Sequence, residues 1–225
     1  MSELFTGPLW GIVLSILCFA AGTWLSRRFP SPLVNPLLIA IALAVAFLKL
    51  TGIPLNLYQE GGDVISLFLG PATASLALSI YNQIAMLRRH WLPITAGALV
   101  GSAVSIGSVL LLCRLFGLDQ ALTASLIPKS VTTPIAMEIS RQGGGIIPLT
   151  VAMVVFTGIL GAVFAPSLAK LLRIQDPISL GVAIGTSSHA LGTSRAIQMG
   201  EIEGAMSGLS IGIAGLITVI LSMFL

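Results

Sequence analysis

The amino-acid sequence predicts an all-α, polytopic membrane protein. Hydrophobic side chains make up 56% of the 225 residues, and charged side chains make up only 8%. A soluble domain carries about 25% charged residues, so this chain has too few to cover a surface in water. Its apolar residues form long continuous runs, which favour membrane helices over a transmembrane β-barrel. Soluble globular, disordered and coiled-coil chains are excluded.

The hydrophobic runs divide the chain into segments of membrane-spanning length. A helix needs about 20 apolar residues to cross a bilayer, and cutting at charged and Gly/Pro/Asn clusters gives about eight segments. They are Pro8–Leu25, Leu33–Leu50, Val64–Leu87, Trp91–Leu115, Ala121–Ser140, Ile146–Leu172, Ile178–Met199 and Ala205–Leu225. No linker between them is long enough for a soluble domain, so residues 1–225 are predicted to form a single integral membrane domain.

The first segment is predicted to be a retained helix. It lacks a basic leader and a small-residue cleavage site, and Trp10 and Trp24 bracket it as interfacial aromatics do.

Basic residues lie in short loops beside the apolar runs, a pattern that orients membrane proteins. The pairs beginning at Arg27 and Arg88 fall on one side if the first three segments span, which places those loops in the cytoplasm and the N-terminus outside. Lys49, Arg114, Lys170 and Arg173 weaken this bias. No nucleic-acid partner is expected.

Two or three of the segments are predicted to be broken, discontinuous helices. The third contains Gly70 and Pro71, the fifth contains Pro134, and the seventh contains Gly185 and Gly192. Proline removes an amide donor, and glycine permits backbone that a helix does not hold. Interrupted backbone at membrane depth survives only where protein or a wet cavity surrounds it. A simple kink is the alternative, above all at Pro71.

The interruption in the fifth segment is a candidate anion site. Thr133 and Pro134 suit the N-cap and first turn of a second half-helix, whose free amides attract a carboxylate. Lys129 and Thr132 precede them, and Lys129 either adds a charge to the site or snorkels to the interface.

The charged residues of the fifth segment have two interpretations. Glu138 and Arg141 are three residues apart on one helical face, so they either pair with each other or leave Glu138 as a proton or cation site.

The seventh segment carries the strongest single candidate, Arg195. With Thr193 as a cap, Arg195 is predicted to lie in the first turn of a half-helix and to clamp a carboxylate beside free amides. Ser187 and Ser188 offer hydroxyls to a polar substrate. His189 is either a coupling-proton site or a structural hydrogen-bond donor.

Weak self-similarity raises the question of an internal repeat. A shift of 59 places Thr73 on Thr132, and a shift of 55 places Pro93 on Pro148. Corresponding interrupted segments in two repeats are typical of transporters. With small residues so common here, chance matches remain the alternative.

The sequence gives little support for an enzymatic function. The two cysteines and two histidines show no metal-ligand spacing, and no Gly-x-Ser-x-Gly motif or P-loop occurs. No enzyme activity, cofactor or metal is expected. The glycines of the last segment, spaced three to four residues apart, suit close helix packing, and a homo-oligomer is expected.

Several motifs resemble those of the LrgB/CidB (antiholin-like) family. The resemblance rests on Lys129–Met137 and Ser188–Ala196, with support from Leu69–Thr73 and Met199–Ala205, and it covers essentially the whole chain. The chain departs from the family pattern at Ser79 and Arg141, and the second departure puts a Glu138–Arg141 role across the family in doubt.

The resemblance implies a multi-pass protein of the bacterial inner membrane with a small four-helix LrgA/CidA-type membrane partner. It also implies one of two functions: control of murein hydrolase and cell lysis, or transport of small monocarboxylates, as in similar plastidial glycolate/glycerate translocators. A fold with crossed, broken transporter helices is expected. The residues favour transport of a glycolate-, pyruvate- or hydroxypropionate-type acid, because a lesion-forming holin has no evident use for a cation at an interrupted helix. The antiholin-like function is the alternative.

Overall fold

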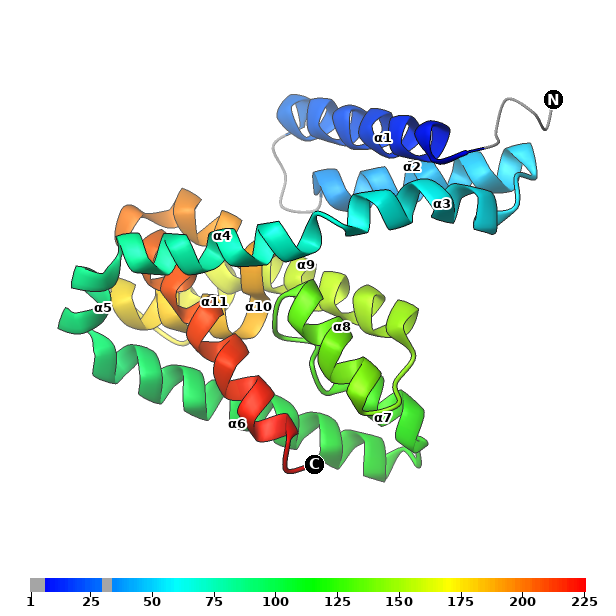
Figure 1. The fold of residues 1–225 in the computed structure, drawn as a ribbon. Helices are drawn as coiled ribbons and strands as arrows, with labels where there is room; N and C mark the ends of the chain where they lie inside the picture. The colour runs from blue at the N-terminus through cyan, green and yellow to red at the C-terminus, as the bar shows by residue number, and fades with distance from the viewer. Residues whose placement is uncertain (1–6, 30–33) are drawn as a thin grey trace. The chain divides into compact units, whose positions relative to one another are not determined.

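The protein is an assembly of α-helices. The computed structural model describes residues 7–29 and 34–225, and every regular element in these ranges is helical (Figure 1). The chain divides into two compact units, residues 1–72 and 73–225, and each is described by itself. A single domain over residues 1–225 stays a prediction. The predicted start of the second segment at Leu33 lies outside the described residues.

The first unit packs two helices against α1. These are α1 (Pro8–Arg28), α2 (Pro36–Thr51) and α3 (Leu55–Ser66). The Asn35 side chain caps α2 by accepting the amides of Leu37 and Leu38. Gly11 and Gly61 allow α1 and α3 to touch backbone to backbone, because a Cβ at either position would collide with the other helix.

Helix α3 is not among the predicted segments. Polar residues such as Gln59, Glu60 and Asp63 interrupt its hydropathy. Tyr58 nevertheless packs on α1, where its hydroxyl lies 2.7 Å from Ser15 Oγ. The helix forms because one face is buried against α1, which a search for apolar runs does not detect.

The third predicted segment is divided into pieces. Helix α3 ends at Ser66, α4 runs over Leu69–Asn82, and α5 runs over Ile84–Arg89. The interruption lies at residues 67–68, just before the predicted Gly70-Pro71. Pro71 instead occupies the first turn of α4, where a helix needs no amide from it.

Three long helices form the frame of the second unit: α6 (Trp91–Leu115), α9 (Ile147–Leu171) and α11 (Glu201–Ser222). Together with α1, they are the helices of the described residues that are long and apolar enough to cross a membrane. Large apolar side chains such as Leu111, Phe156 and Leu216 are exposed on them, as a lipid-facing surface requires. The all-α polytopic membrane fold class is confirmed.

Between α6 and α9 the chain forms a helical hairpin. Helix α7 (Gln120–Leu126) enters it, residues 127–132 are not helical, and α8 (Thr133–Gln142) leaves it. The hairpin closes on itself, because the Ile146 amide donates to Ser125 Oγ at 2.7 Å. Both ends of the hairpin therefore lie at the same end of the unit.

Helix α10 (Pro177–Met199) also folds back. His189 has the non-helical angles φ 42° and ψ −141°. In a straight helix, residues 180 and 196 would lie about 24 Å apart at 1.5 Å per residue. Leu180 and Ala196 instead share one core cluster with Ala169 of α9. Helix α10 therefore has two antiparallel arms, residues 177–188 and 190–199.

The break in α10 lies between the two glycines that were expected to cause it. Gly185 and Gly192 keep negative φ within the helix, so the prediction that they carry the non-helical backbone is wrong. Their role is close packing instead. A Cβ at Gly185 would collide with the backbone of Ser207 in α11, and one at Gly192 would collide with Ser188 of the opposite arm.

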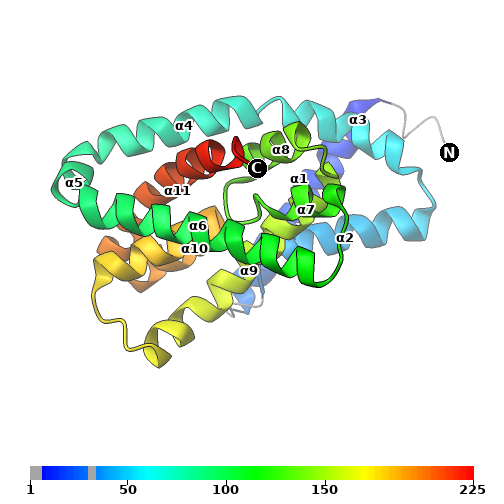
Figure 2. The ribbon, with the colours of Figure 1, turned by 90° about the horizontal axis from the view of Figure 1, so that it is seen from below.

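The two hairpins enter the second unit from opposite ends. Ile94 near the start of α6 packs with Val182 of α10 and Met206 of α11, and Thr218 near the end of α11 bonds Ser102 of α6. Helices α6 and α11 are therefore parallel, and Figure 2 shows them side by side with α10 next to them. Helix α9 runs the other way, from Thr150, which bonds Ser140 of α8, to the cluster of Ala169 and Leu180.

Candidate functional site

The second unit contains a cavity of about 850 Å³ where the two hairpins meet. Its walls come from α6, residues 129–130, α9 and the first arm of α10, and most of them are apolar. The polar side chains of the lining are Ser105, Lys129, Ser130, Thr157, Ser179, Thr186, Ser187 and Ser188. The interruption of the first hairpin and the end of the first arm of α10 thus contribute to one site.

Lys129 is the cation of this cavity, and hydroxyl groups surround its ammonium. Lys129 Nζ donates to Ser130 Oγ at 3.1 Å and to Ser105 Oγ at 3.3 Å, and the two hydroxyls lie 2.9 Å apart. Among the described residues the ion pair found is Glu138–Arg141, so no carboxylate neutralises Lys129 there. A partly buried cation without a counter-charge is costly and favours a bound anion.

Two buried hydroxyls beside the interruptions have no hydrogen-bond partner within the described ranges. They are Thr132 Oγ1 and Thr186 Oγ1, in side chains that are 7% and 5% exposed. An unsatisfied buried polar group costs about 1–3 kcal/mol. Thr186 lines the cavity, so a polar ligand or water there would relieve this cost for its hydroxyl.

The N-cap of α8 lies one residue earlier than predicted. Thr132, and not Thr133, is the cap, and neither its side chain nor another makes a capping hydrogen bond. Pro134 occupies the first turn, as its missing amide allows. Thr132 and Thr133 border the interruption but do not line the cavity with Lys129.

Arg195 does not line the cavity either. It lies on the second arm of α10, two turns from His189, and its Nη1 donates to Gln198 Oε1 at 2.8 Å. Thr193 does not cap a half-helix, because its hydroxyl donates to the His189 carbonyl and contacts Ser207 Oγ at 2.7 Å. The predicted first-turn geometry is therefore wrong, and carboxylate binding by Arg195 stays a prediction.

His189 lies at the turn of α10, buried and held to α9. Its side chain is 4% exposed, and its Nε2–H donates to the carbonyl of Val154 at 2.8 Å. It is not among the residues that line the Lys129 cavity. This arrangement suits the structural alternative, while proton coupling stays a prediction.

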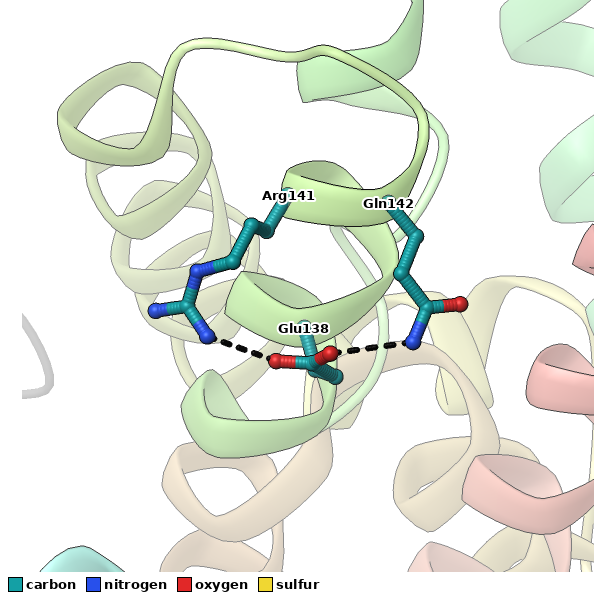
Figure 3. A network of polar contacts seen from close by, with 3 residues as sticks. All are labelled: Glu138, Arg141 and Gln142. Atoms are coloured by element: carbon teal, nitrogen blue, oxygen red, sulfur yellow. Dashed lines mark hydrogen bonds and ion pairs between the residues drawn. The ribbon is translucent and has the colours of Figure 1, made fainter.

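Glu138 is paired at the surface of α8. Its carboxylate accepts Arg141 Nη1 at 2.7 Å and Gln142 Nε2 at 2.9 Å (Figure 3). The Glu138 side chain is 52% exposed and does not face Lys129. Pairing with Arg141 is thus observed, and a role of Glu138 in ion or proton coupling stays a prediction.

Five polar lining residues were not predicted from the sequence: Ser105, Ser130, Thr157, Ser179 and Thr186. Ser130 and Thr186 are sequence neighbours of the predicted site residues Lys129 and Ser187 and belong to the same motifs. Ser105 lies 24 positions from Lys129 in a continuous apolar helix, and no local pattern marks it.

The described residues offer no obvious metal centre. No group of three or more His, Cys, Asp or Glu side chains comes together within them. Cys18 and Cys113 are both buried and free. The polar groups at the Lys129 cavity are an ammonium and hydroxyls, which suit an anion better than a cation.

Comparison with known proteins identifies the family. The LrgB-like family model matches residues 15–225. The chain belongs to the LrgB-like family. Antiholin-like protein LrgB of Bacillus subtilis (strain 168) is 37% identical to it over 219 residues, which cover 97% of this chain and 95% of the relative. Proteins with the same name from Bacillus mycoides (strain KBAB4) and Bacillus cereus (strain B4264) are 36% identical over 214 residues, 95% of this chain and 93% of each relative.

No solved structure matches this LrgB-like chain. The resemblance inferred from the sequence motifs is confirmed, and the relatives match over nearly their whole length. Their printed name agrees with the antiholin-like function better than with carboxylate transport.

Proposed function

We propose that this LrgB-like chain is an antiholin-like membrane protein that restrains murein hydrolase activity and cell lysis. The observation that carries this proposal is the similarity to proteins named antiholin-like over 93–95% of their own length. The bacterial inner membrane is the proposed location. A small four-helix membrane protein of LrgA/CidA type and further copies of the chain are the proposed partners.

Autolysis of cells that lack the gene tests this function. Deletion is expected to accelerate the loss of optical density after a lysis-inducing detergent, and expression of the full chain with its partner is expected to reverse this. The Lys129→Met variant is expected to complement as well as the wild type if lysis control needs no anion site. An unchanged lysis rate after deletion of the gene contradicts the antiholin-like function.

A second candidate function, transport of small monocarboxylates, is favoured by the Lys129 cavity. One ammonium and several hydroxyls form the polar part of an otherwise apolar cavity of about 850 Å³. A single positive charge matches a single carboxylate, the hydroxyls match a hydroxy or keto oxygen, and the apolar walls match a short carbon chain. Interrupted helices at membrane depth are typical of transporter binding sites.

Uptake of labelled glycolate or pyruvate into vesicles tests the second candidate. Vesicles containing the chain and its partner are expected to show saturable uptake. Hydrogen bonds to charged groups contribute about 1.5–3 kcal/mol, so Lys129→Met is expected to weaken apparent affinity about 10-fold or more.

Arg195→Gln is the matched comparison for that experiment. Because Arg195 lies outside the cavity lining, this variant is expected to retain uptake. Full uptake by Lys129→Met, with loss in Arg195→Gln, would contradict the Lys129 site and support the clamp predicted from the sequence. A change in autolysis that needs no substrate, together with a lack of uptake, would contradict the transport candidate and support only the antiholin-like function.

A further inference from the structure

The second unit contains another cavity, which no function described above uses. It has a volume of about 950 Å³ and is lined by α6, α7, α8 and α11. Its polar lining includes Arg114, Gln120, Thr123, Glu138, Gln142 and Ser222. Glu138 is already paired with Arg141, so the exposed Arg114 gives this lining a positive charge for an anion to approach.

The two cavities lie toward opposite ends of α6. The Lys129 cavity reaches Pro93 and Ser179, in the first turns of α6 and α10, whereas the second cavity reaches Arg114 and Ser222, in the last turns of α6 and α11. A helix of 25 residues such as α6 rises about 37 Å, more than the roughly 30 Å of the hydrocarbon core. With α6 across the membrane, the cavities face opposite sides.

The interruption of the first hairpin separates the two cavities. Lys129 and Ser130 line one of them, while Ile127 and Pro134 line the other. Between these residues lie Pro128, which is fully buried, and Val131, which is 3% exposed. Residues 128–131 therefore form a short stretch of chain between the two linings.

Few backbone hydrogen bonds hold this stretch. Within residues 128–132 the amides of Lys129 and Val131 donate to Leu126 and Pro128 at 3.2 and 3.3 Å, and the helical pattern resumes only in α8. Local rearrangement therefore breaks fewer hydrogen bonds here than in a continuous helix.

We infer that the second cavity is the opposite-facing entrance to the Lys129 site, with residues 127–132 as the barrier between the two. A small monocarboxylate then reaches Lys129 from either side of the membrane by movement of this short stretch. This inference rests on the transport candidate above and adds to it the second entrance and the position of the barrier.

Cysteine accessibility in the full chain tests the arrangement without measuring transport. In a background with Cys18→Ser and Cys113→Ser, single variants are made in the Lys129 cavity (Thr157→Cys), the second cavity (Thr123→Cys) and the barrier (Val131→Cys). A charged, membrane-impermeant methanethiosulfonate is applied to right-side-out and inside-out vesicles. Leu111→Cys, exposed on α6 outside both linings, is the control for a lipid-facing thiol.

Thr157→Cys and Thr123→Cys are each expected to react at least about ten times faster from one side, and from opposite sides. Val131→Cys is expected to react at least about ten times more slowly than both, and Leu111→Cys is expected not to react. Phe164→Cys and Ser222→Cys repeat the measurement nearer the mouths, and gel filtration in detergent confirms folding.

Reaction of both cavity variants from the same side, or of Val131→Cys as fast as its neighbours, would overturn the inference. So would a lack of reaction at all four cavity positions in folded protein. The expected labelling without any carboxylate uptake would instead contradict the transport candidate and leave the two entrances in place.

Discussion

At the scale of single residues, His189 shows how contacts hold an unfavourable backbone. A residue other than glycine that adopts φ 42° and ψ −141° destabilises the fold by about 1–3 kcal/mol. The imidazole compensates through burial and its hydrogen bond to Val154, and Thr193 Oγ1 donates to the His189 carbonyl. The turn of α10 therefore depends on what the side chain contacts in α9.

Substitution of His189 tests this balance. His189→Ala loses the hydrogen bond and the packing but keeps the strain, whereas His189→Gly loses the same contacts and relieves the strain. Both variants are expected to lower the melting temperature of the protein in detergent, and alanine is expected to lower it more.

The matched control for His189 is its helical neighbour, Ala190→Gly. At residue 190, glycine is expected to lower the free energy of unfolding by about 1 kcal/mol, as it does in an ordinary helix. A lower stability of His189→Gly than of His189→Ala would contradict backbone strain at residue 189.

At the scale of elements, glycines determine how closely α10 approaches its neighbours. The first arm lies directly on the α11 backbone through Gly185, and Gly161 of α9 faces the Ser188 side chain. Small residues at helix contacts let backbones come close in membranes. The position of Ser187 and Ser188 at the Lys129 cavity therefore depends on residues that contact no ligand.

Gly185→Ala tests this close packing. The added methyl group would overlap the backbone of Ser207, which cannot move like a flexible side chain. Overpacking costs about 1–3 kcal/mol, so the melting temperature in detergent is expected to fall by several degrees. Gly208→Ala in α11 is the matched control, because nothing lies within 4 Å of its added Cβ. Equal stability of the two variants would contradict the proposed contact.

Asp176 gives the start of α10 a dependence on pH. The Ser179 hydroxyl and amide both donate to its carboxylate, and mainly the hydroxyl lowers the pKa of Asp176 below its ordinary 3.8. The stabilisation by this N-cap is then complete above the ordinary pKa and is lost as pH falls through the lowered value.

Thermal unfolding of Asp176→Asn measures this contribution. The variant keeps a capping side chain without the charge, so it is expected to melt below the wild type at neutral pH. The difference in melting temperature is expected to shrink below about pH 4, as the wild-type carboxylate is protonated. A difference that grows on acidification would have the wrong sign.

At the scale of the whole molecule, the fold-back of α7 and α8 changes how charges distribute across the membrane. Because this hairpin returns to the end where it started, α9 brings Lys170 and Arg173 to the end of the unit where α6 begins. Arg88 and Arg89 lie at that same end. If the hairpin were a full span, Lys170 and Arg173 would oppose the positive-inside rule. In this fold they support the rule, because they lie at the same end as Arg88 and Arg89.

The membrane sidedness of two loops tests this topology. The loop before α10 is expected in the cytoplasm and the chain end after α11 outside. In the cysteine-free background, an impermeant maleimide added to whole cells is expected to label Phe224→Cys and not Gln175→Cys. Gln175→Cys should react only after the membrane is opened, and labelling of both positions in intact cells would contradict the predicted sidedness.

Much of the fold was predictable because membrane helices follow local rules. The helix Trp91–Leu115 has the predicted bounds, since hydropathy and the flanking residues determine a span without reference to neighbours. Helix α3 was not predictable in this way, because Tyr58 and its polar neighbours become helical against α1. At the site, Lys129, Ser187 and Ser188 were expected, whereas Ser105 comes from a distant helix.

The sequence by itself determined that the chain is a helical membrane protein of the LrgB-like family and that Pro134 stands at an interruption. These properties depend on hydropathy, motifs and proline geometry, which act over a few neighbouring residues. Only the tertiary structure decided that both interrupted regions fold back, and that Lys129 and not Arg195 lines the cavity between them. The direction of a chain after a non-helical residue depends on which helices pack against it, and those contacts come from residues far away in the sequence.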